Sequence, residues 1–107
     1  MKTRVEVDVE VLEFTASLAP APRRQLRLGI RGLERGVGDL MALEGKLEGY
    51  WRLRVGDYRV LLRYFMRNGQ QVCRCVFAER RATVYEVFET LLMERLQRED
   101  RSATEDR

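Results

Sequence analysis

The fold is constrained most by an alternating stretch at residues 50–67. In its first part an apolar set alternates with a polar set that contains two arginines: Trp51, Leu53 and Val55 against Tyr50, Arg52 and Arg54. Since successive side chains of a strand point to opposite faces, this pattern is typical of a half-buried strand. Gly56-Asp57 predicts a turn, and a second strand at 58–67 adds Arg59, Arg63 and Arg67. The sequence therefore predicts an antiparallel strand pair that carries a row of guanidinium groups.

The rest of the chain predicts strands and helices around this pair. In chain order, the expected elements are a strand at 3–9, helices at 11–18 and 20–35, strands at 50–55, 58–67 and 71–78, and a helix from about Thr83 to 96. Asn68-Gly69 is a strong hairpin signal between the last two strands. In the last strand, Cys73 and Cys75 are expected to share a face with Phe77. Residues 40–49, with spaced glycines, are expected to form a connector.

This order predicts an α+β fold: a mostly antiparallel four-stranded sheet with an N-terminal helix hairpin packed against it and a C-terminal helix, in the order β-α-α-β-β-β-α. A chain of 107 residues suits one compact domain, which we place at 1–96. The apolar pattern ends there, so residues 97–107 are expected to form a charged, disordered tail. There are no apolar runs of about 20 residues to cross a bilayer. Acidic residues interrupt the N-terminus, which argues against a secretory leader and predicts a cytoplasmic protein.

The net charge of +3 is unevenly distributed. Residues 50–85 hold eight arginines against two acids, whereas residues 86–107 hold four arginines against seven acids. The positive charge thus falls on the expected sheet, which predicts a polyanionic partner. Of the 20 basic residues, 18 are arginine, the side chain that holds phosphate through a planar fork. A GC-rich gene would produce the same bias, and the sequence does not separate the two causes.

Soft metal ligands are scarce. The chain has no histidine and two cysteines, so a zinc site is not expected, and we predict no metal and no cofactor. Two buried thiols in a reducing compartment are the simpler interpretation of Cys73 and Cys75.

Two segments together are similar to a known family. The run Gly49-Tyr50-Trp51-Arg52-Leu53-Arg54-Val55-Gly56-Asp57-Tyr58-Arg59-Val60, followed by Glu79-Arg80-Arg81 and Val84-Tyr85, resembles the RelE/ParE toxin superfamily of type II toxin–antitoxin systems, over roughly residues 3–96. RelE-like members cleave messenger RNA in the ribosomal A site, whereas ParE-like members poison DNA gyrase and lack the catalytic set. The resemblance implies a cognate antitoxin as partner, in a hetero-oligomer, and contacts with mRNA and 16S ribosomal RNA.

The resemblance also implies site residues, which favour the RelE-like branch. The catalytic positions fall on Arg54, Arg59, Arg80 and Tyr85, and further phosphate-binding positions fall on Arg52 and Arg81. The spacing leaves Arg80 and Arg81 as alternatives for one position, and Arg80 is preferred. Many members have histidine just before that arginine, where this chain has Glu79.

RNA is cleaved when its 2′-hydroxyl attacks the adjacent phosphorus, which requires a proton acceptor, charge stabilisation and a proton donor. Without histidine, we expect Tyr85 to be the general base, its phenolate favoured by nearby guanidinium groups and by the N-terminus of the last helix. Arg54 and Arg59 would hold the phosphorane and Arg80 the leaving oxygen, while Glu79 or Glu86 could share the proton transfer. The alternatives are a ParE-like gyrase inhibitor and a module that binds RNA or antitoxin without cleaving.

Overall fold

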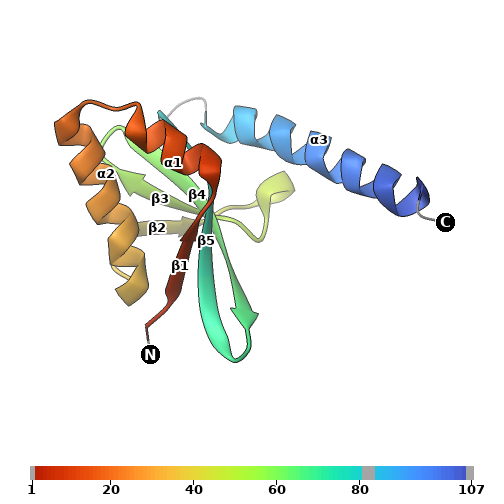
Figure 1. The fold of residues 1–107 in the computed structure, drawn as a ribbon, viewed down its shortest axis with the longest axis horizontal. Helices are drawn as coiled ribbons and strands as arrows, with labels where there is room; N and C mark the ends of the chain where they lie inside the picture. Colours follow the sequence, from red (N-terminus) through yellow and green to blue (C-terminus); the bar gives the residue numbers. More distant parts are fainter. Residues whose placement is uncertain (1, 81–83, 106–107) are drawn as a thin grey trace.

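The computed structural model describes the backbone of residues 2–80 and 84–105, and the side chains of residues 2–80 and 85–95. Its elements are β1 (Arg4–Val7), α1 (Val9–Ala16), α2 (Pro20–Gly32), the 3-10 turn η1 (Leu33–Arg35), β2 (Asp39–Ala42), the 3-10 turn η2 (Gly45–Leu47), β3 (Trp51–Val55), β4 (Tyr58–Arg67), β5 (Gln70–Arg80) and α3 (Val84–Glu105). The fold is α+β, as the sequence predicts (Figure 1).

The sheet has five strands in the order β1-β5-β4-β3-β2. β1 pairs with β5 in parallel, and the other three pairings are antiparallel. The prediction of a mostly antiparallel sheet is confirmed, but the strand number was wrong because β2 was expected to be part of a connector. β2 has only four residues and lies at the edge of the sheet, where it pairs on one side. A strand this short gives only a weak alternation of apolar and polar residues in the sequence.

Helices cover both faces of the sheet (Figure 1). On one face, which we call the helix-pair face, α1 and α2 bury a core with strand residues such as Leu53, Val60 and Cys75. On the other face, which we call the α3 face, Phe88 of α3 lies in a smaller cluster with Leu61 and Val76. The predicted helix hairpin on one face is therefore confirmed, and Trp51 lies on the helix-pair face, as alternation predicted.

The C-terminal helix extends past the apolar stripe. α3 continues to Glu105, whereas the sequence predicted a helix to residue 96 and a disordered tail from residue 97. Glu, Arg and Gln in this segment are good helix formers, so backbone hydrogen bonding can continue where apolar packing stops. Residues 106 and 107 lie outside the described part of the chain.

A β-bulge interrupts the pairing of the two longest strands. Leu61 lies opposite Phe77 and Leu62 lies opposite Cys75, which leaves Val76 as the extra residue on β5. The bulge reverses the alternation of everything that follows in β5. Cys75 lies in the core of the helix-pair face and Phe77 packs on the α3 face, so the prediction that they share a face was wrong.

Both hairpin turns use left-handed backbone. Asn68 and Gly69 have φ angles of 51° and 80°, positive at both central positions as the favoured two-residue hairpin turn requires. Gly56 has a φ of 57° in the turn between β3 and β4. Both predicted turns are confirmed. The turn at Gly56 joins the adjacent ends of β3 and β4, the two strands that carry the arginines.

Gly29 sets how closely α2 approaches the sheet, because a Cβ there would lie 2.6 Å from Cγ2 of Val55. We expect Gly29→Ala to lower the free energy of unfolding by about 1–3 kcal/mol through overpacking, although the same change stabilises an open helix. Urea denaturation measures this. In a Val55→Ala background the clashing methyl groups are gone, and the substitution should become neutral or stabilising. An equal cost in both backgrounds would refute a steric origin.

Edge strand β1 is held partly by an ion pair that depends on pH. Arg67 donates hydrogen bonds to Glu6, and this interaction holds the pKa of the Glu6 carboxyl below its ordinary value of 4.5. A lowered folded-state pKa stabilises the fold above the unfolded value, and the contribution is lost as the pH falls through the lowered pKa. Arg67→Gln should therefore make the acid-side loss of stability shallower, measured by urea denaturation at several pH values below 6. Arg63→Gln is the matched control, since both arginines stack on Phe65; an identical profile for the two variants would contradict the assignment.

Candidate RNA-cleavage site

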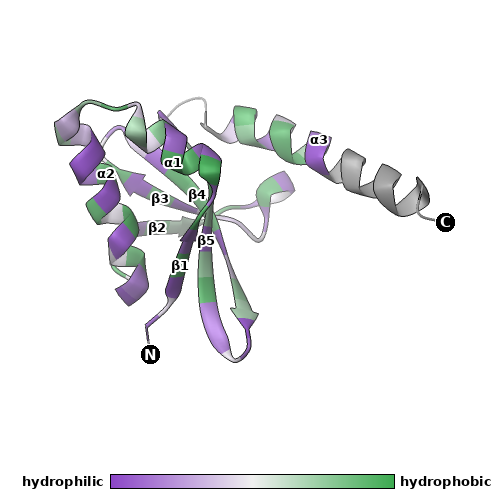
Figure 2. Ribbon diagram, viewed as in Figure 1, coloured by the Kyte–Doolittle hydropathy of each residue, from purple (hydrophilic) through white to green (hydrophobic). Residues whose placement is uncertain are grey.

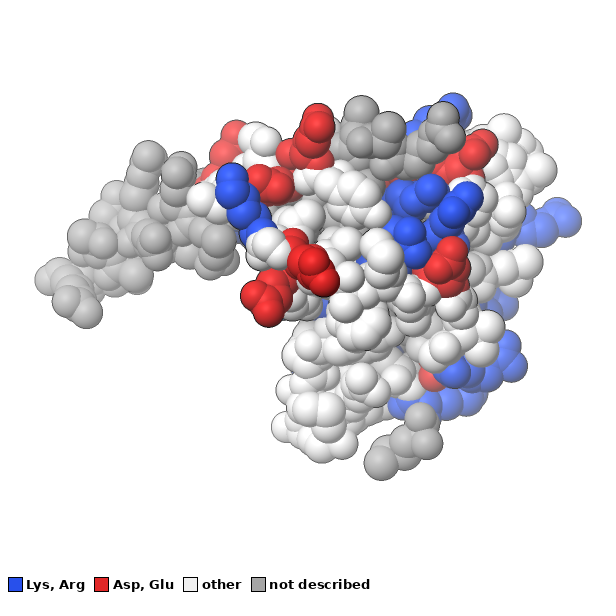
Figure 3. Space-filling model, turned by 180° about the vertical axis from the view of Figure 1, so that it is seen from behind, with Lys and Arg blue, Asp and Glu red and all other residues white. Residues whose placement is uncertain are grey.

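Three charged side chains form a row across the end of the α3 face. Arg54 of β3 lies directly opposite Arg59 of β4, and Arg59 lies directly opposite Glu79 of β5. Directly paired residues on adjacent antiparallel strands project from the same face of the sheet. Figure 3 shows a group of basic side chains over this end of the sheet with acidic side chains directly beside it, and further acidic side chains nearer to α3. Asp39 of β2 lies directly opposite Arg54 at the other end, so the two arginines of the row lie between two acids.

The Arg59 guanidinium is fixed by the backbone beside it. Its Nη1 donates to the carbonyl oxygens of Gly56 and Tyr58, both at 3.0 Å. Neither Arg54 nor Arg59 forms an ion pair with an acid among the residues that the structure describes. Two adjacent guanidinium groups without a carboxylate partner repel each other, and an anion bound between them would relieve that repulsion. The pair is thus suited to hold a phosphate.

Arg52 is held by the strand that the sequence analysis missed. Its Nη2 donates to Oδ1 of Asp39 at 3.0 Å, and its side chain is 14% exposed. Its Nε is buried without a hydrogen-bond partner in the described part of the chain. Asp39 stands at the start of β2, so the edge strand supplies the acid that orients Arg52. Arg52 thus lies on the α3 face opposite Leu61, with its charge balanced by Asp39.

Tyr85 enters the same face from the first turn of α3. Its side chain is half-buried and packs against the apolar cluster of the α3 face, formed by Leu47, Leu61, Val76 and Phe88. Two ring contacts fix the helix over this cluster: Phe88 lies 5.1 Å from Tyr50 and 5.7 Å from Phe77, measured between ring centroids. The structure thus places Tyr85 on the α3 face, with apolar side chains along its ring.

Comparisons with known proteins bear on the fold of this chain. The sequence matches no protein-family model and no curated protein. The fold matches that of an archaeal RelE–RelB complex from Pyrococcus horikoshii, at 29% identity and a TM-score of 0.58, covering 77% of this chain and 98% of that chain. The chain is therefore similar in fold to solved toxins of the RelE/ParE type.

Two further solved structures share the RelE/ParE fold. The toxin–antitoxin complex RelBE2 from Mycobacterium tuberculosis matches with a TM-score of 0.62 at 21% identity, covering 76% of this chain and 100% of that chain. A YoeB/ParE toxin from Agrobacterium tumefaciens matches with a TM-score of 0.58 at 17% identity, covering 73% of this chain and 98% of that chain. Both branches of the superfamily are therefore represented among the structures that this chain resembles.

The bulge in β5 determines whether Glu79 or Arg80 lies on the same face as Arg54 and Arg59. Arg80 lies opposite Tyr58, and its guanidinium lies 5.6 Å from the centroid of the Tyr58 ring. Tyr58 belongs to the core of the helix-pair face, so Arg80 projects from the face opposite to Arg54 and Arg59. Arg81, the other residue considered for this position, lies outside the described residues.

Glu79 occupies the third place in the row. Its Oε1 accepts a hydrogen bond from the backbone N–H of Arg80 at 3.0 Å. The sequence analysis named Glu79 as an alternative for proton transfer, and the structure places it directly across from Arg59. Asp39 had no signal in the sequence, because its role depends on the pairing of β2 with β3.

Of the other three tyrosines, Tyr50 lies on the α3 face against Phe88, and Tyr58 and Tyr64 lie on the helix-pair face. Tyr58 is buried, and Tyr64 packs edge-on against Trp51 at 5.9 Å between ring centroids. Burial raises the pKa of Tyr64 to about 12, so this phenol stays protonated at neutral pH. Neither residue can accept a proton at the arginine row from the opposite side of the sheet. Tyr85, in the first turn of α3, therefore remains the tyrosine proposed as proton acceptor on the α3 face.

A cavity continues from this region along α3. It has a volume of about 310 Å³, and its lining includes Tyr50, Phe88 and three arginines, Arg63, Arg74 and Arg95. Arg74 Nε donates to Oδ1 of Asp8 at 2.7 Å, which raises the pKa of that guanidinium, so it is charged at every pH of interest. Asp8 pairs with Arg74 and Glu10 pairs with Arg95, so acids partly neutralise the positive charge around this cavity. In the part of the chain that the structure describes, neither a cluster of possible metal ligands nor a helix able to span a membrane is found.

Proposed function

We propose that this chain is the toxin of a type II toxin–antitoxin system and that it cleaves messenger RNA positioned in the ribosomal A site. The toxin role is supported by the fold it shares with toxins solved alone or with their antitoxins. The observation that carries the cleavage activity is the Arg54–Arg59 cross-strand pair, which has no described acid partner and shares its face with Tyr85.

The reaction needs no group from outside the RNA as nucleophile. The 2′-oxygen attacks the adjacent phosphorus, the bond from phosphorus to the 5′-oxygen breaks, and the departing 5′-oxygen takes a proton from solvent water. The products carry a 2′,3′-cyclic phosphate and a 5′-hydroxyl. Arg54 and Arg59 stabilise the charge that develops on the phosphorane oxygens. Tyr85 takes the proton of the 2′-hydroxyl, and Glu79 is the second candidate for this step because it lies across from Arg59.

Arg80 is the proposed catalytic residue whose side chain lies away from Arg54 and Arg59 in this structure. A role beside the leaving oxygen requires its guanidinium to move from the Tyr58 ring around the end of β5. Binding of the message between the row and Tyr85 supplies an anion that would favour this movement. In the protein without RNA, Arg54 and Arg59 form the phosphate-binding pair. Arg80 joins them only in the complex with RNA.

The ribosome is expected to align the reacting atoms of the RNA, which compensates for the weak proton-transfer groups of this site. Without histidine, proton transfer by the side chains present is poorly matched to neutral pH. Fixing the 2′-oxygen, phosphorus and leaving oxygen in line can contribute about 7–11 kcal/mol to lowering the barrier. Cleavage should therefore depend on ribosomes and be slow on free RNA.

A gyrase-directed activity is the second candidate, and the apolar packing of Tyr85 favours it. A half-buried phenol against Leu61 and Phe88 is also what a purely structural tyrosine would show. In that case the basic face binds a partner without chemistry, as in ParE-like toxins.

One experiment separates these functions. The chain is added to a translation extract, the 5′ ends of the message are mapped, and DNA supercoiling by gyrase is measured in parallel. Cuts in phase with codons that appear only with ribosomes support the cleavage proposal. Intact message with inhibited supercoiling identifies a gyrase inhibitor, and no effect on either identifies a binding module.

A further inference from the structure

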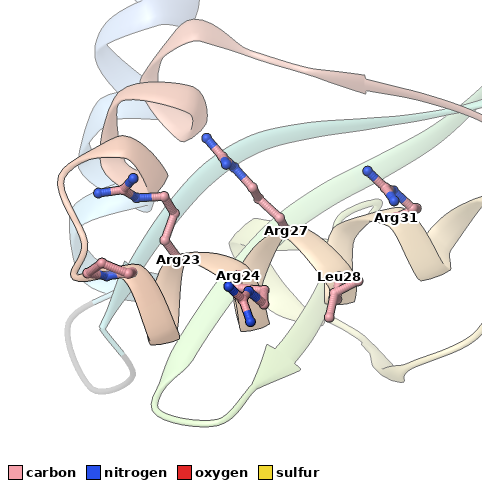
Figure 4. Close-up of a pocket in the computed structure, with 6 residues that line it drawn as sticks. Arg23, Arg24, Arg27, Leu28 and Arg31 are labelled. Carbon is pink, nitrogen blue, oxygen red and sulfur yellow. The ribbon is translucent and has the colours of Figure 1, made fainter.

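Helix α2 presents a second basic surface, on the side of the sheet away from the candidate cleavage site. Its 13 residues contain four arginines and no acid: Arg23, Arg24, Arg27 and Arg31. Together with Pro20 and Leu28 they line a cavity of about 350 Å³ (Figure 4). Hydrophilic residues dominate this helix in Figure 2, in contrast to the start of α3.

These arginines lack the acid partners that several arginines on the sheet have. The ion pairs of the described residues take up Arg4, Arg52, Arg67, Arg74 and Arg95. No arginine of α2 forms an ion pair with a described residue, and Arg23 is held by the carbonyl oxygen of Leu18 through Nε and Nη2, at 3.2 and 2.9 Å. Glu34, near Arg27 and Arg31, lines a second cavity of about 250 Å³ without pairing with either of them. The surface is therefore a concentration of uncompensated positive charge.

The spacing of the arginines costs helix stability. Arg23, Arg27 and Arg31 follow one another at four-residue intervals, and Figure 4 shows Arg27 and Arg31 on the same side of α2. Like charges at this interval destabilise a helix. They also lie about 6 Å apart along the axis, given a rise of about 1.5 Å per residue, which is comparable with the separation of successive phosphates along a nucleic-acid strand. A bound row of phosphates would remove the repulsion.

The chemistry of the surface favours the phosphate backbone over bases or a protein. The exposed side of α2 carries no aromatic side chain, and single-stranded nucleic acids are held largely by stacking on such residues. Its exposed apolar contribution is Leu28, at 58% exposure, which is too little for the apolar face of a partner helix. Arginine forks suit phosphate oxygens.

We propose that α2 binds the phosphodiester backbone of a nucleic-acid duplex, separately from the site that cleaves. The contact is independent of base sequence and of the chemistry at Arg59 and Tyr85. It would anchor the protein on structured nucleic acid by a second surface, on the layer opposite to the α3 face.

The test uses the full chain, fluorescence anisotropy and a labelled 20-base-pair RNA duplex, at several salt concentrations. Arg27→Glu should weaken binding at least about tenfold at 0.1 M salt, and the slope of log affinity against log salt should decrease in magnitude by about 1. Arg24→Glu, one turn away, should give a similar loss. Lys46→Glu is the charge-matched control, since Lys46 is 75% exposed and pairs with Glu89 of α3; it should change the affinity less than about twofold.

A stability measurement separates binding from folding. Arg27→Glu places an acid between two arginines at four-residue spacing, so the melting temperature should hold or rise while binding falls. A folding defect would lower both. The loss should also persist in an Arg59→Ala background, so that failure of the cleavage proposal leaves this test intact.

The probes identify the source of the phosphates. A preference for the RNA duplex over a DNA duplex of the same sequence identifies structured RNA, and equal affinity identifies either duplex; both results support the proposal. It is overturned if Arg27→Glu binds duplex as wild type does, if a single strand binds more tightly than both duplexes, or if the variant loses affinity only for a polyglutamate peptide, which would indicate an acidic protein partner.

Discussion

Arg59→Ala should reduce ribosome-dependent cleavage by two to three orders of magnitude. The substitution removes one of the two guanidinium groups aimed at the phosphorane, and loss of a single donor of this kind typically costs about 10²–10³ in rate. The effect should fall on the rate of the cleavage step in single-turnover assays, because that interaction is strongest in the transition state. Arg59→Lys should recover only part of the rate, since a lysine keeps the charge and loses the fork.

Arg63→Ala is the matched control for Arg59. Arg63 is on the same strand and the same face of the sheet, and it stacks on Phe65 at 5.3 Å from the ring centroid. Its removal should change cleavage by less than about threefold. Because Arg59 also donates to two carbonyl oxygens at the β3–β4 turn, the melting temperature is measured alongside. Equal losses for the two variants would contradict a specific clamp.

Tyr85→Phe should lower the cleavage rate by about 10²–10⁴, the usual contribution of a positioned proton acceptor. Phenylalanine keeps the ring against Leu61 and Phe88, so the apolar contacts of α3 remain. The melting temperature should therefore stay close to that of the wild type while activity falls. Cleavage is measured by 5′-end mapping in the translation extract.

Two companion variants sharpen this result. Tyr50→Phe removes a hydroxyl from the same cluster, in which Tyr50 contacts Phe88, and should leave cleavage nearly unchanged. Glu79→Gln tests the other proton acceptor. Full activity of Tyr85→Phe together with inactivity of Glu79→Gln would move the general base from the phenol to the carboxylate across from Arg59. Full activity of both would leave the site without a proton acceptor and refute the mechanism.

The central strand pair could be predicted from the sequence because its signals are local. Alternation at residues 50–67 reports which side chains share a face, and Gly56 and Asn68-Gly69 report the turns. The pairing of Arg54 with Arg59 follows from the short turn between them. The fold class and the arginine pair were therefore accessible before the structure.

The parts that could not be predicted depend on contacts between distant segments. β2 forms because Asp39 and its neighbours pair with the free edge of β3. The four residues of β2 carry no local sequence pattern that predicts this pairing. The bulge at Val76 is set by how β5 fits both β4 and the Phe88 cluster. Neither Asp39 beside Arg52 nor Glu79 beside Arg59 could be derived from residue spacing alone.

The unpaired residue at Val76 affects how relatives should be aligned with this chain. Counting back from Tyr85 does not tell which of Glu79 and Arg80 is equivalent to a given position, because one inserted or deleted residue in the preceding strand exchanges their sides. An alignment gap at the bulge and a gap after the strand lead to different choices between Glu79 and Arg80 for the same position of a relative. Superposing the backbones up to residue 80 resolves this ambiguity, so residues of this chain should be matched to those of similar structures on that basis.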